Sequence, residues 1–247
     1  MWRGCAKHAE GAEVDVPGEA DMIEIVKEQL DVGLVSENPE VVDFWRDEAG
    51  LVFDHSIPVV KGQVQYRFDE RGTVVKVNVR AALSGDQRSG IQELLIARDD
   101  LEAPREMADP DGNRVVLVPT GTDGVTQIGV RISVRDLGRT MAYYRNVLGF
   151  EEEAPNRVRC GDSVLLFDER ADAPSGFVLA QRGWLYLTVQ IRDCDAETAR
   201  VEAAGGEVAV RPMNLGAVAR MAMVRDPDGN LLEISQRAQW TGPLPEE

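Results

Sequence analysis

The chain has 247 residues, of which 43% are hydrophobic, and its formal net charge at pH 7 is −16. This length and apolar content are enough for one or two buried hydrophobic cores. The excess of acidic residues argues against binding to nucleic acid or to an anionic membrane surface, because either would repel the chain. No stretch of about 18 apolar residues occurs, which argues against a transmembrane helix.

Residues 1–21 are rich in Gly, Glu, Asp and Ala without periodicity, and they predict a disordered acidic tail. Met22 stands directly before the first strand-like run and is an alternative start of the natural chain. The tail has no compact apolar segment with a cleavage site. The three cysteines are too widely spaced for a disulfide framework or a zinc knuckle. We therefore expect a cytoplasmic protein.

A β-hairpin is predicted in the first half, from alternating segments at 63–68 and 74–80 joined by turn residues. These segments and the strand before them carry four notable polar side chains, those of His55, Gln65, Lys76 and Asn78. Such alternation usually marks a solvated sheet face, so we expect these side chains to point outward. If they turn inward instead, they form a binding site.

The pentapeptide Asp-Pro-Asp-Gly-Asn occurs at 109–113 and again at 226–230, and each copy runs into an apolar segment. Pro presets φ at the second position of a turn, Gly tolerates positive φ, and Asp and Asn hydrogen-bond their own backbone. Each copy therefore predicts a tight turn between two strands. A turn this particular, used twice, indicates a duplicated chain.

A longer repeat supports the duplication, because 35–51 aligns with 134–150 at a constant shift of 99 residues (134 − 35). The two pentapeptides are 117 residues apart (226 − 109), so the second copy holds 18 more residues (117 − 99). These residues include a helix predicted at 195–204, which the first copy lacks. The expected organisation is an N-terminal domain at 22–121 with its second helix lost, a C-terminal domain at 125–237, and a tail at 238–247.

A unit of strand, helix and several strands also recurs within the second copy, where 134–149 lies over 191–206. With the helix sequence Tyr143-Tyr144-Arg145 and the segment 226–233, this pattern resembles the vicinal oxygen chelate superfamily of glyoxalases, bleomycin-resistance proteins and extradiol dioxygenases. The resemblance implies an α+β fold of tandem βαβββ modules that form two cupped mixed sheets. In metal-using members, ligands project into each cup from the first strand and the closing strand of each module.

The ligand pattern of those members is not matched in this sequence. Within one residue, the corresponding positions are Gly129, Tyr186, Glu233, Leu30, Gln92 and Val116. Only Glu233 is a suitable ligand, and neither of the two histidines, His8 and His55, falls at such a position. No cofactor is therefore predicted, and a divalent metal such as Mg²⁺ on oxygen ligands is the alternative.

Alternation predicts a polar lining for the cup of the second half, because successive side chains of a strand face opposite sides. The expected lining residues are Arg131, Trp184, Tyr186, Gln190, Arg220 and Glu233. This set suits a planar or carboxylate-bearing small molecule. The alternative is that Glu233 forms an ion pair with Arg131 or Arg220, which pairs the charges in the cup and has no catalytic role. The cup of the first half is expected to be apolar, lined by Leu30, Val32, Leu34, Leu94 and Ile96.

These residues are compatible with three functions. The leading hypothesis is an enzyme, of lyase, isomerase or dioxygenase-like type, that acts without a metal on a small carbonyl, enol or aromatic carboxylate compound. Glu233 would transfer a proton, Tyr186 would donate to an oxyanion, and an arginine would bind a carboxylate. The second hypothesis is a resistance-type protein that sequesters a small molecule. The third is a metal-dependent dioxygenase or lyase with ligands at other positions. A homodimer is compatible with each.

Overall fold

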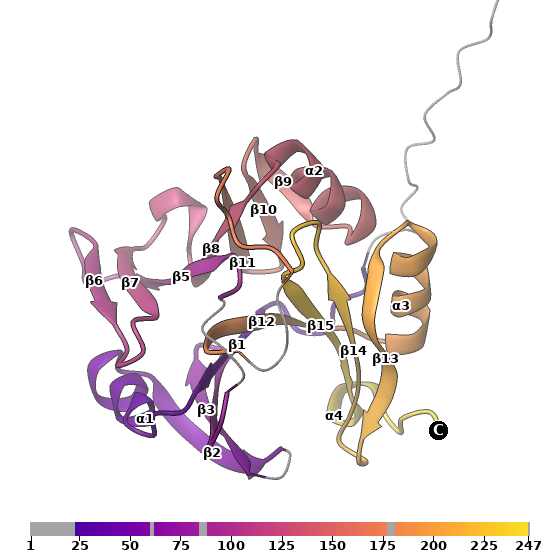
Figure 1. The fold of residues 1–247 in the computed structure, drawn as a ribbon, viewed down its shortest axis with the longest axis horizontal. Helices are drawn as coiled ribbons and strands as arrows, with labels where there is room; N and C mark the ends of the chain where they lie inside the picture. Colours follow the sequence, from indigo (N-terminus) through magenta and orange to yellow (C-terminus); the bar gives the residue numbers. More distant parts are fainter. Residues whose placement is uncertain (1–22, 60–61, 84–87, 177–180, 247) are drawn as a thin grey trace, which may run out of the picture.

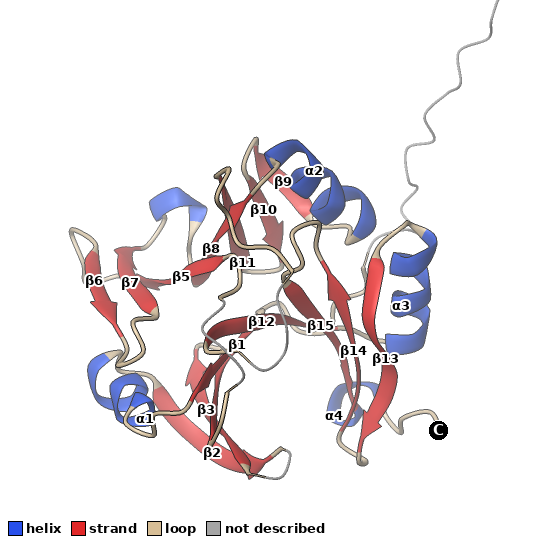
Figure 2. Ribbon diagram, viewed as in Figure 1, coloured by secondary structure: helices blue, strands red, loops and turns tan. Residues whose placement is uncertain are grey.

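The structure, a computed structural model, describes residues 23–59, 62–83, 88–176 and 181–246; the predicted tail at 1–21 and Met22 lie outside these residues. The described chain forms two mixed sheets, of eight and seven strands, with few helices (Figures 1 and 2). The predicted α+β architecture of two cupped sheets is confirmed. In Figure 1 the eight-stranded sheet curls into an arch, with α1 and α3 on its outer side.

In spatial order, the eight-stranded sheet contains β13 (Glu207–Leu215), β14 (Ala219–Arg225), β15 (Leu231–Arg237), β12 (Gly183–Gln190), β1 (Asp31–Ser36), β4 (Thr73–Arg80), β3 (Gln63–Glu70) and β2 (Val52–Pro58). The seven-stranded sheet contains β6 (Arg105–Ala108), β7 (Arg114–Pro119), β5 (Ile91–Arg98), β8 (Ile128–Val134), β11 (Ser163–Glu169), β10 (Arg157–Cys160) and β9 (Glu151–Ala154). The predicted hairpin is β3 and β4, which pair from Gln63 opposite Arg80 to Glu70 opposite Thr73.

The helices are α1 (Val41–Asp43) continued by η2 (Phe44–Glu48), α2 (Leu137–Ala142) continued by η4 (Tyr143–Val147), η3 (Thr122–Gly124), α3 (Cys194–Ala203) and α4 (Ala238–Thr241). In the first copy, residues 99–104 between β5 and β6 contain no helix, whereas the second copy has α3 before β13. None of the helices within the described residues is long and apolar enough to span a membrane.

Each sheet combines one module from each half of the chain. The modules β1–β4 and β12–β15 join through the antiparallel pair β1 and β12, and β5–β7 and β8–β11 join through β5 and β8. The expectation that Arg131 and Glu233 line one cup is therefore wrong, because β8 and β15 belong to different sheets. The sequence period defines the modules, but it does not determine which modules pair.

The duplicated turns have the same hydrogen bonds in both copies. In each, the first Asp, Asp109 or Asp226, accepts hydrogen bonds from the amides of the third and fifth residues and from the Asn side chain. The turns connect β6 to β7 and β14 to β15, as predicted. The rigid self-bonded turn therefore starts the closing strand of the module in both copies.

The helix-covered faces of both sheets form one large core, with Trp45, Phe68 and Phe167 among its largest fully buried side chains. The five residues expected to line the first cup lie in this core instead: Leu30, Val32, Leu34, Leu94 and Ile96. The strand phase is one residue from that expected, so Asp31 and Gly33 of β1 face the opposite side, the inner face of the arch. These strands carry apolar residues on both faces, and alternation alone therefore cannot determine their phase.

Candidate functional site

A buried ammonium group lies at the centre of the inner face of the eight-stranded sheet. Lys76 of β4 is 2% exposed, and its Nζ donates a hydrogen bond to Thr188 Oγ1 at 2.7 Å. The same Nζ lies 3.5 Å from Glu233 Oε1 and 3.7 Å from Asp31 Oδ2. The four residues come from β4, β12, β15 and β1, the four central strands of the sheet. We call this set the Lys76 cluster.

Tyr186 covers one side of the Lys76 cluster, with Lys76 Nζ 5.3 Å from the centre of its ring. The ring lies against Gly33, where an added Cβ would come within 2.4 Å of the phenol Cζ. Gly33 is therefore needed for the close approach of β1 and the ring. Burial raises the pKa of Tyr186 far above its usual value, and the Glu233 carboxylate raises it further. The phenol is thus a neutral hydrogen-bond donor at ordinary pH.

Arg67 of β3 adds a second buried cation to this face. It is 7% exposed, and its Nη1 donates a hydrogen bond to Gln65 Oε1 at 2.8 Å. Gln65 in turn donates to Asn78 Oδ1 at 3.0 Å. Among the residues that the structure describes, no carboxylate lies within ion-pair distance of Arg67. A buried guanidinium without a counter-ion is costly, and an anionic ligand would relieve that cost.

The charges around the Lys76 cluster favour an anion. Besides Lys76 and Arg67, the cations Lys27 and Arg237 act electrostatically on this cluster, together with the carboxylates of Asp31 and Glu233. Burial alone would raise the pKa of Asp31, but the Lys76 and Lys27 ammonium groups hold it below its usual value. Burial lowers the pKa of Lys76 despite the two carboxylates beside it. This locally positive region lies within a chain of net charge −16.

The inner face of the seven-stranded sheet holds a different ionic cluster, built on Arg131. Its Nε donates to Glu93 Oε1 at 2.8 Å, and Nη2 and Nη1 lie 3.2 Å from Asp123 and 3.6 Å from Asp168. The rest of this face is aliphatic, formed by Leu95, Ala97, Val116, Val118, Val125, Val164 and Leu166. Three carboxylates already surround Arg131, so it is poorly placed to bind a substrate carboxylate.

Comparison with known proteins gives one family match. Residues 125–234 match the family model described as the Glyoxalase/Bleomycin resistance protein/Dioxygenase superfamily. This part of the chain belongs to that superfamily. The resemblance drawn from the sequence is thus confirmed.

Similarity to solved members of the superfamily extends over most of the chain. The chain is similar to glyoxalase I from Zea mays, with 15% identity, coverage of 84% of this chain and 92% of that chain, and a TM-score of 0.66. It is also similar to a putative dioxygenase from Bacillus subtilis, with 12% identity, coverage of 87% and 86%, and a TM-score of 0.61. No curated protein matches the chain significantly in sequence. These identities support a shared fold only.

The Lys76 cluster does not fit the divalent metal that superfamily members use. The first and closing strands of the paired modules are β1, β4, β12 and β15, and the side chains that meet there are Asp31, Lys76, Thr188 and Glu233. An ammonium among these side chains repels a divalent cation and already engages both carboxylates. Within the described part of the chain, no group of three or more His, Cys, Asp or Glu residues is placed to hold a metal ion.

The inner face brings together most of the polar residues that the sequence singled out. Tyr186, Gln190 and Glu233 lie on this face, and Gln190 Nε2 donates to Asp31 Oδ2 at 3.1 Å. The outward orientation expected for the hairpin is wrong, because three of its polar side chains are buried on the same face: Gln65, Lys76 and Asn78. The neighbouring strands β1 and β12 supply their partners, which the hairpin pattern alone does not reveal.

Three other expected site residues lie elsewhere. Arg220 faces α3, where it forms two hydrogen bonds of 2.7 and 2.8 Å with the carboxylate of Asp195. Trp184 lies in the main core because the pairing of β1 and β12 is irregular beside it, which turns its side chain away from Tyr186. His55 lies on the exposed edge strand β2, 2.8 Å from the Asp54 carboxylate.

Sequence reasoning missed Asp31, Thr188 and Arg67 as members of the site. Thr188 lies two residues after Tyr186 on β12, and Arg67 lies two residues after Gln65 on β3. Strand alternation therefore places each on the same face as its neighbour, and this pattern could have identified them. Asp31 is one position from the expected ligand position Leu30, within the stated uncertainty of one residue. Its place in the site depends on the phase of β1, which the sequence pattern leaves open.

Proposed function

We propose that the protein is a metal-independent enzyme that transfers a proton on a small anionic carbonyl or enol compound at the Lys76 cluster. The observation that carries the proposal is the ammonium of Lys76, held by one side chain from each of the other three central strands. A fixed internal cation can stabilise developing negative charge on an oxygen, which is the task that a metal performs in related folds.

Each residue of the face has a distinct role in this proposal. Arg67 binds a substrate carboxylate, since it is buried and lacks a carboxylate partner among the described residues. The Glu233 carboxylate, 3.5 Å from Lys76 Nζ, removes a proton from the carbon next to the substrate carbonyl. The electron pair of that C–H bond moves toward the carbonyl oxygen and forms an enolate. Lys76 and the neutral phenol of Tyr186 stabilise the enolate oxygen through hydrogen bonds.

Return of the proton from Glu233 to carbon completes the cycle. Where the proton on Glu233 first exchanges with solvent, return to the same carbon replaces a substrate hydrogen with one from solvent, and return to another carbon is an isomerisation. In an elimination the enolate expels a leaving group, and Glu233 releases its proton to solvent. Each route only moves protons and electron pairs, so the cycle needs no oxidant or reductant.

A second candidate function is sequestration of a small anionic compound without turnover. The burial of the cluster favours it: Asp31, Lys76 and Glu233 are 1%, 2% and 9% exposed. Groups held this tightly can serve to position Arg67 and Tyr186 for binding alone. The same experiment separates the two functions.

The experiment follows hydrogen–deuterium exchange at carbon by ¹H NMR, with the full chain in D₂O and pyruvate, 2-oxobutyrate and phenylpyruvate as probes. The proposal predicts catalysed exchange of at least one probe, unchanged by EDTA. Glu233→Gln should lower the exchange rate by a factor on the order of 100 or more. Arg139→Gln removes an exposed charge on α2 and serves as the matched control, with an unchanged rate.

Saturable binding of a probe without exchange would support sequestration instead. Exchange that persists in Glu233→Gln would show that this carboxylate is not the base. Exchange abolished by EDTA and restored by a divalent metal would overturn the metal-independent mechanism.

A further inference from the structure

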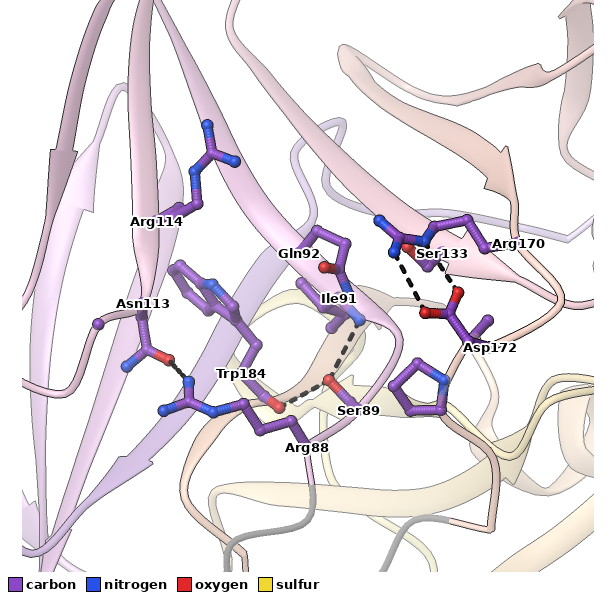
Figure 3. A pocket seen from close by; sticks show the side chains of 13 residues that line it. Arg88, Ser89, Ile91, Gln92, Asn113, Arg114, Ser133, Arg170, Asp172 and Trp184 are labelled. Carbon is purple, nitrogen blue, oxygen red and sulfur yellow. Dashed lines mark hydrogen bonds and ion pairs between the residues drawn. The ribbon is translucent and has the colours of Figure 1, made fainter.

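A cavity of about 390 Å³ lies apart from the Lys76 cluster, beside the first Asp-Pro-Asp-Gly-Asn turn and the ends of β5, β8 and β12 (Figure 3). Its volume is within the range of small-molecule sites, which begins at about 300 Å³. Arg88, Arg114, Arg170 and Trp184 are among its lining residues. Tyr186, two residues from Trp184 on β12, packs in the separate cluster on the inner face. The cavity and the Lys76 cluster therefore lie on opposite faces of that strand.

The cavity is cationic although the chain as a whole is strongly acidic. Three arginines line it, and one carboxylate, that of Asp172, lines it with them. Arg170 is engaged by Asp172, at 3.2 Å, and Arg114 is engaged by two carboxylates outside the lining, Glu106 at 3.1 Å and Glu93 at 3.4 Å. Arg88 is therefore the lining arginine whose charge no described carboxylate neutralises, and it attracts anions locally although the chain's net charge is −16.

Arg88 is the cation best able to bind a ligand. Its Nη1 donates to Asn113 Oδ1 at 3.0 Å and its Nη2 donates to the carbonyl oxygen of Asp111 at 2.8 Å. Both partners are neutral, and no carboxylate among the described residues forms an ion pair with Arg88. The self-bonded turn holds Asn113 in place, since its Nδ2 donates to Asp109 Oδ2 at 2.7 Å. The guanidinium is thus oriented by the turn and keeps its full charge for an anion.

The remaining lining of the cavity is mixed, with an apolar part beside the polar Ser89, Gln92 and Ser133. Trp184, Ile91 and Pro174 contribute to the apolar part, and Figure 3 shows the indole of Trp184 between Arg114 and Arg88. The Trp184 ring is itself fixed by an edge-to-face contact with Trp45, at 5.8 Å between ring centres. Trp184 is only 3% exposed, so a ligand ring meets it together with the half-buried Pro174, and this apolar surface beside the oriented guanidinium of Arg88 suits a planar ring with a negative charge.

We propose that this cavity is a second binding site, independent of the Lys76 cluster, for a small aromatic carboxylate. The carboxylate pairs with Arg88, and the ring lies against the apolar part of the lining at Trp184. The Asp109–Asn113 turn positions the arginine. This gives the first copy of the duplicated turn a role in binding as well as in connecting strands.

The proposal is tested by isothermal titration calorimetry of the full chain with benzoate and indole-3-acetate, using methyl benzoate as the uncharged comparison. Saturable binding of at least one carboxylate at 50 mM salt is expected, with no detectable binding of the ester. Arg88→Gln should weaken binding at least tenfold, and Trp184→Phe should weaken it less. Arg139→Gln, which removes an equal charge elsewhere, and Glu233→Gln should leave it unchanged.

Several results would overturn the proposal. These are the absence of saturable binding of either carboxylate, equal affinity in Arg88→Gln, and an equal loss in Arg139→Gln, which would indicate a general charge effect. Binding that is lost in Glu233→Gln and kept in Arg88→Gln would place the ligand at the Lys76 cluster instead. Arg88 is an exposed side chain, so its replacement should leave the fold intact, and circular dichroism checks this point.

Discussion

Lys76 Nζ and Glu233 Oε1 lie 3.5 Å apart, with side chains only 3% and 11% exposed, although one residue belongs to the first half of the chain and the other to the second. Neither half can therefore build this site alone. The pair forms only when β1 of the first module joins β12 of the fourth. A duplication that began as two similar halves has thus produced one composite polar site on the eight-stranded sheet and a different one on the seven-stranded sheet.

The Lys76–Glu233 pair should show a large energetic coupling. Removing one partner of a buried ion pair typically costs about 3 kcal/mol or more, because the other charge remains buried without compensation. Lys76→Met and Glu233→Gln should each lower the free energy of unfolding, and the double variant should lose less than the sum. Urea denaturation of the four proteins measures the coupling, which we expect at roughly 1–3 kcal/mol. Strictly additive losses would contradict a direct interaction.

Gly33 should not tolerate a side chain. A Cβ there would lie 2.4 Å from the Tyr186 Cζ, so Gly33→Ala must displace the phenol from the Lys76 cluster. We expect a loss of stability of about 1–3 kcal/mol, as in other overpacked sites. Carbon exchange should fall with it, because Tyr186 no longer reaches the enolate oxygen. Tyr186→Leu in the Gly33→Ala background is the control: it should recover part of the stability and none of the exchange. Failure to recover stability would place the strain elsewhere.

Arg67 should favour binding of an anionic substrate without stabilising the fold. Its buried guanidinium has only the neutral Gln65 as a described hydrogen-bond partner, so Arg67→Gln should leave the free energy of unfolding unchanged or raise it by about 1 kcal/mol. The same variant should raise KM for an anionic substrate much more than it lowers kcat. Arg98→Gln is the matched control, because Arg98 forms two hydrogen bonds with the Glu70 carboxylate, at 2.7 and 2.9 Å. Arg98→Gln should lower the free energy of unfolding. Equal changes in the free energy of unfolding for Arg67→Gln and Arg98→Gln would contradict the prediction.

The second turn should make stability depend on pH. Burial raises the pKa of Asp226 to about 6, partly offset by hydrogen bonds from Asn230. The folded state thus holds this proton more tightly than the unfolded state does. The resulting stabilisation is fully present below about pH 4, the usual pKa of an Asp, and is lost as the pH rises through about 6.

The free energy of unfolding, measured from pH 4 to pH 7, tests this dependence. The loss should be smaller in Asp226→Asn than in the natural chain. Asp109→Asn, in the twin turn, is the matched comparison, because burial also raises the pKa of Asp109. Tyr144 donates a hydrogen bond to Asp226 at 3.3 Å, whereas among the described residues no tyrosine donates one to Asp109. An equal pH dependence in the natural chain and in Asp226→Asn would show that another group titrates.

The fold was largely predictable because its evidence is local and repeated. The twin pentapeptides gave the turns before β7 and β15, and the 99-residue shift between 35–51 and 134–150 gave the matching helices. The partner of each module was not predictable, because strand pairing across the duplication depends on contacts between distant residues. Because the pairing of the modules was unknown, the prediction placed Arg131 and Glu233 in one cup, whereas they lie in different sheets.

The site was predictable in part for a related reason. Tyr186, Gln190 and Glu233 were correctly placed on one face, because the second half alternates clearly between polar and apolar residues. The residues Asp31 and Lys76 were not placed with them. Strand β1 is apolar around Asp31, and the hairpin pattern allowed either orientation of Lys76. Whether an ion pair is buried depends on which strands lie beside it, and the local sequence pattern does not show this.

We propose that the Lys76 ammonium stands where the fold would otherwise hold a divalent cation. The most direct measurement is the metal content of the protein and of Lys76→Glu, each incubated with Mn²⁺ and Zn²⁺ and then freed of loose metal by gel filtration. The claim predicts negligible metal in the natural chain, and about one ion per chain in Lys76→Glu, where three carboxylates and Thr188 would meet. One ion per natural chain, lost in Glu233→Gln, would contradict it.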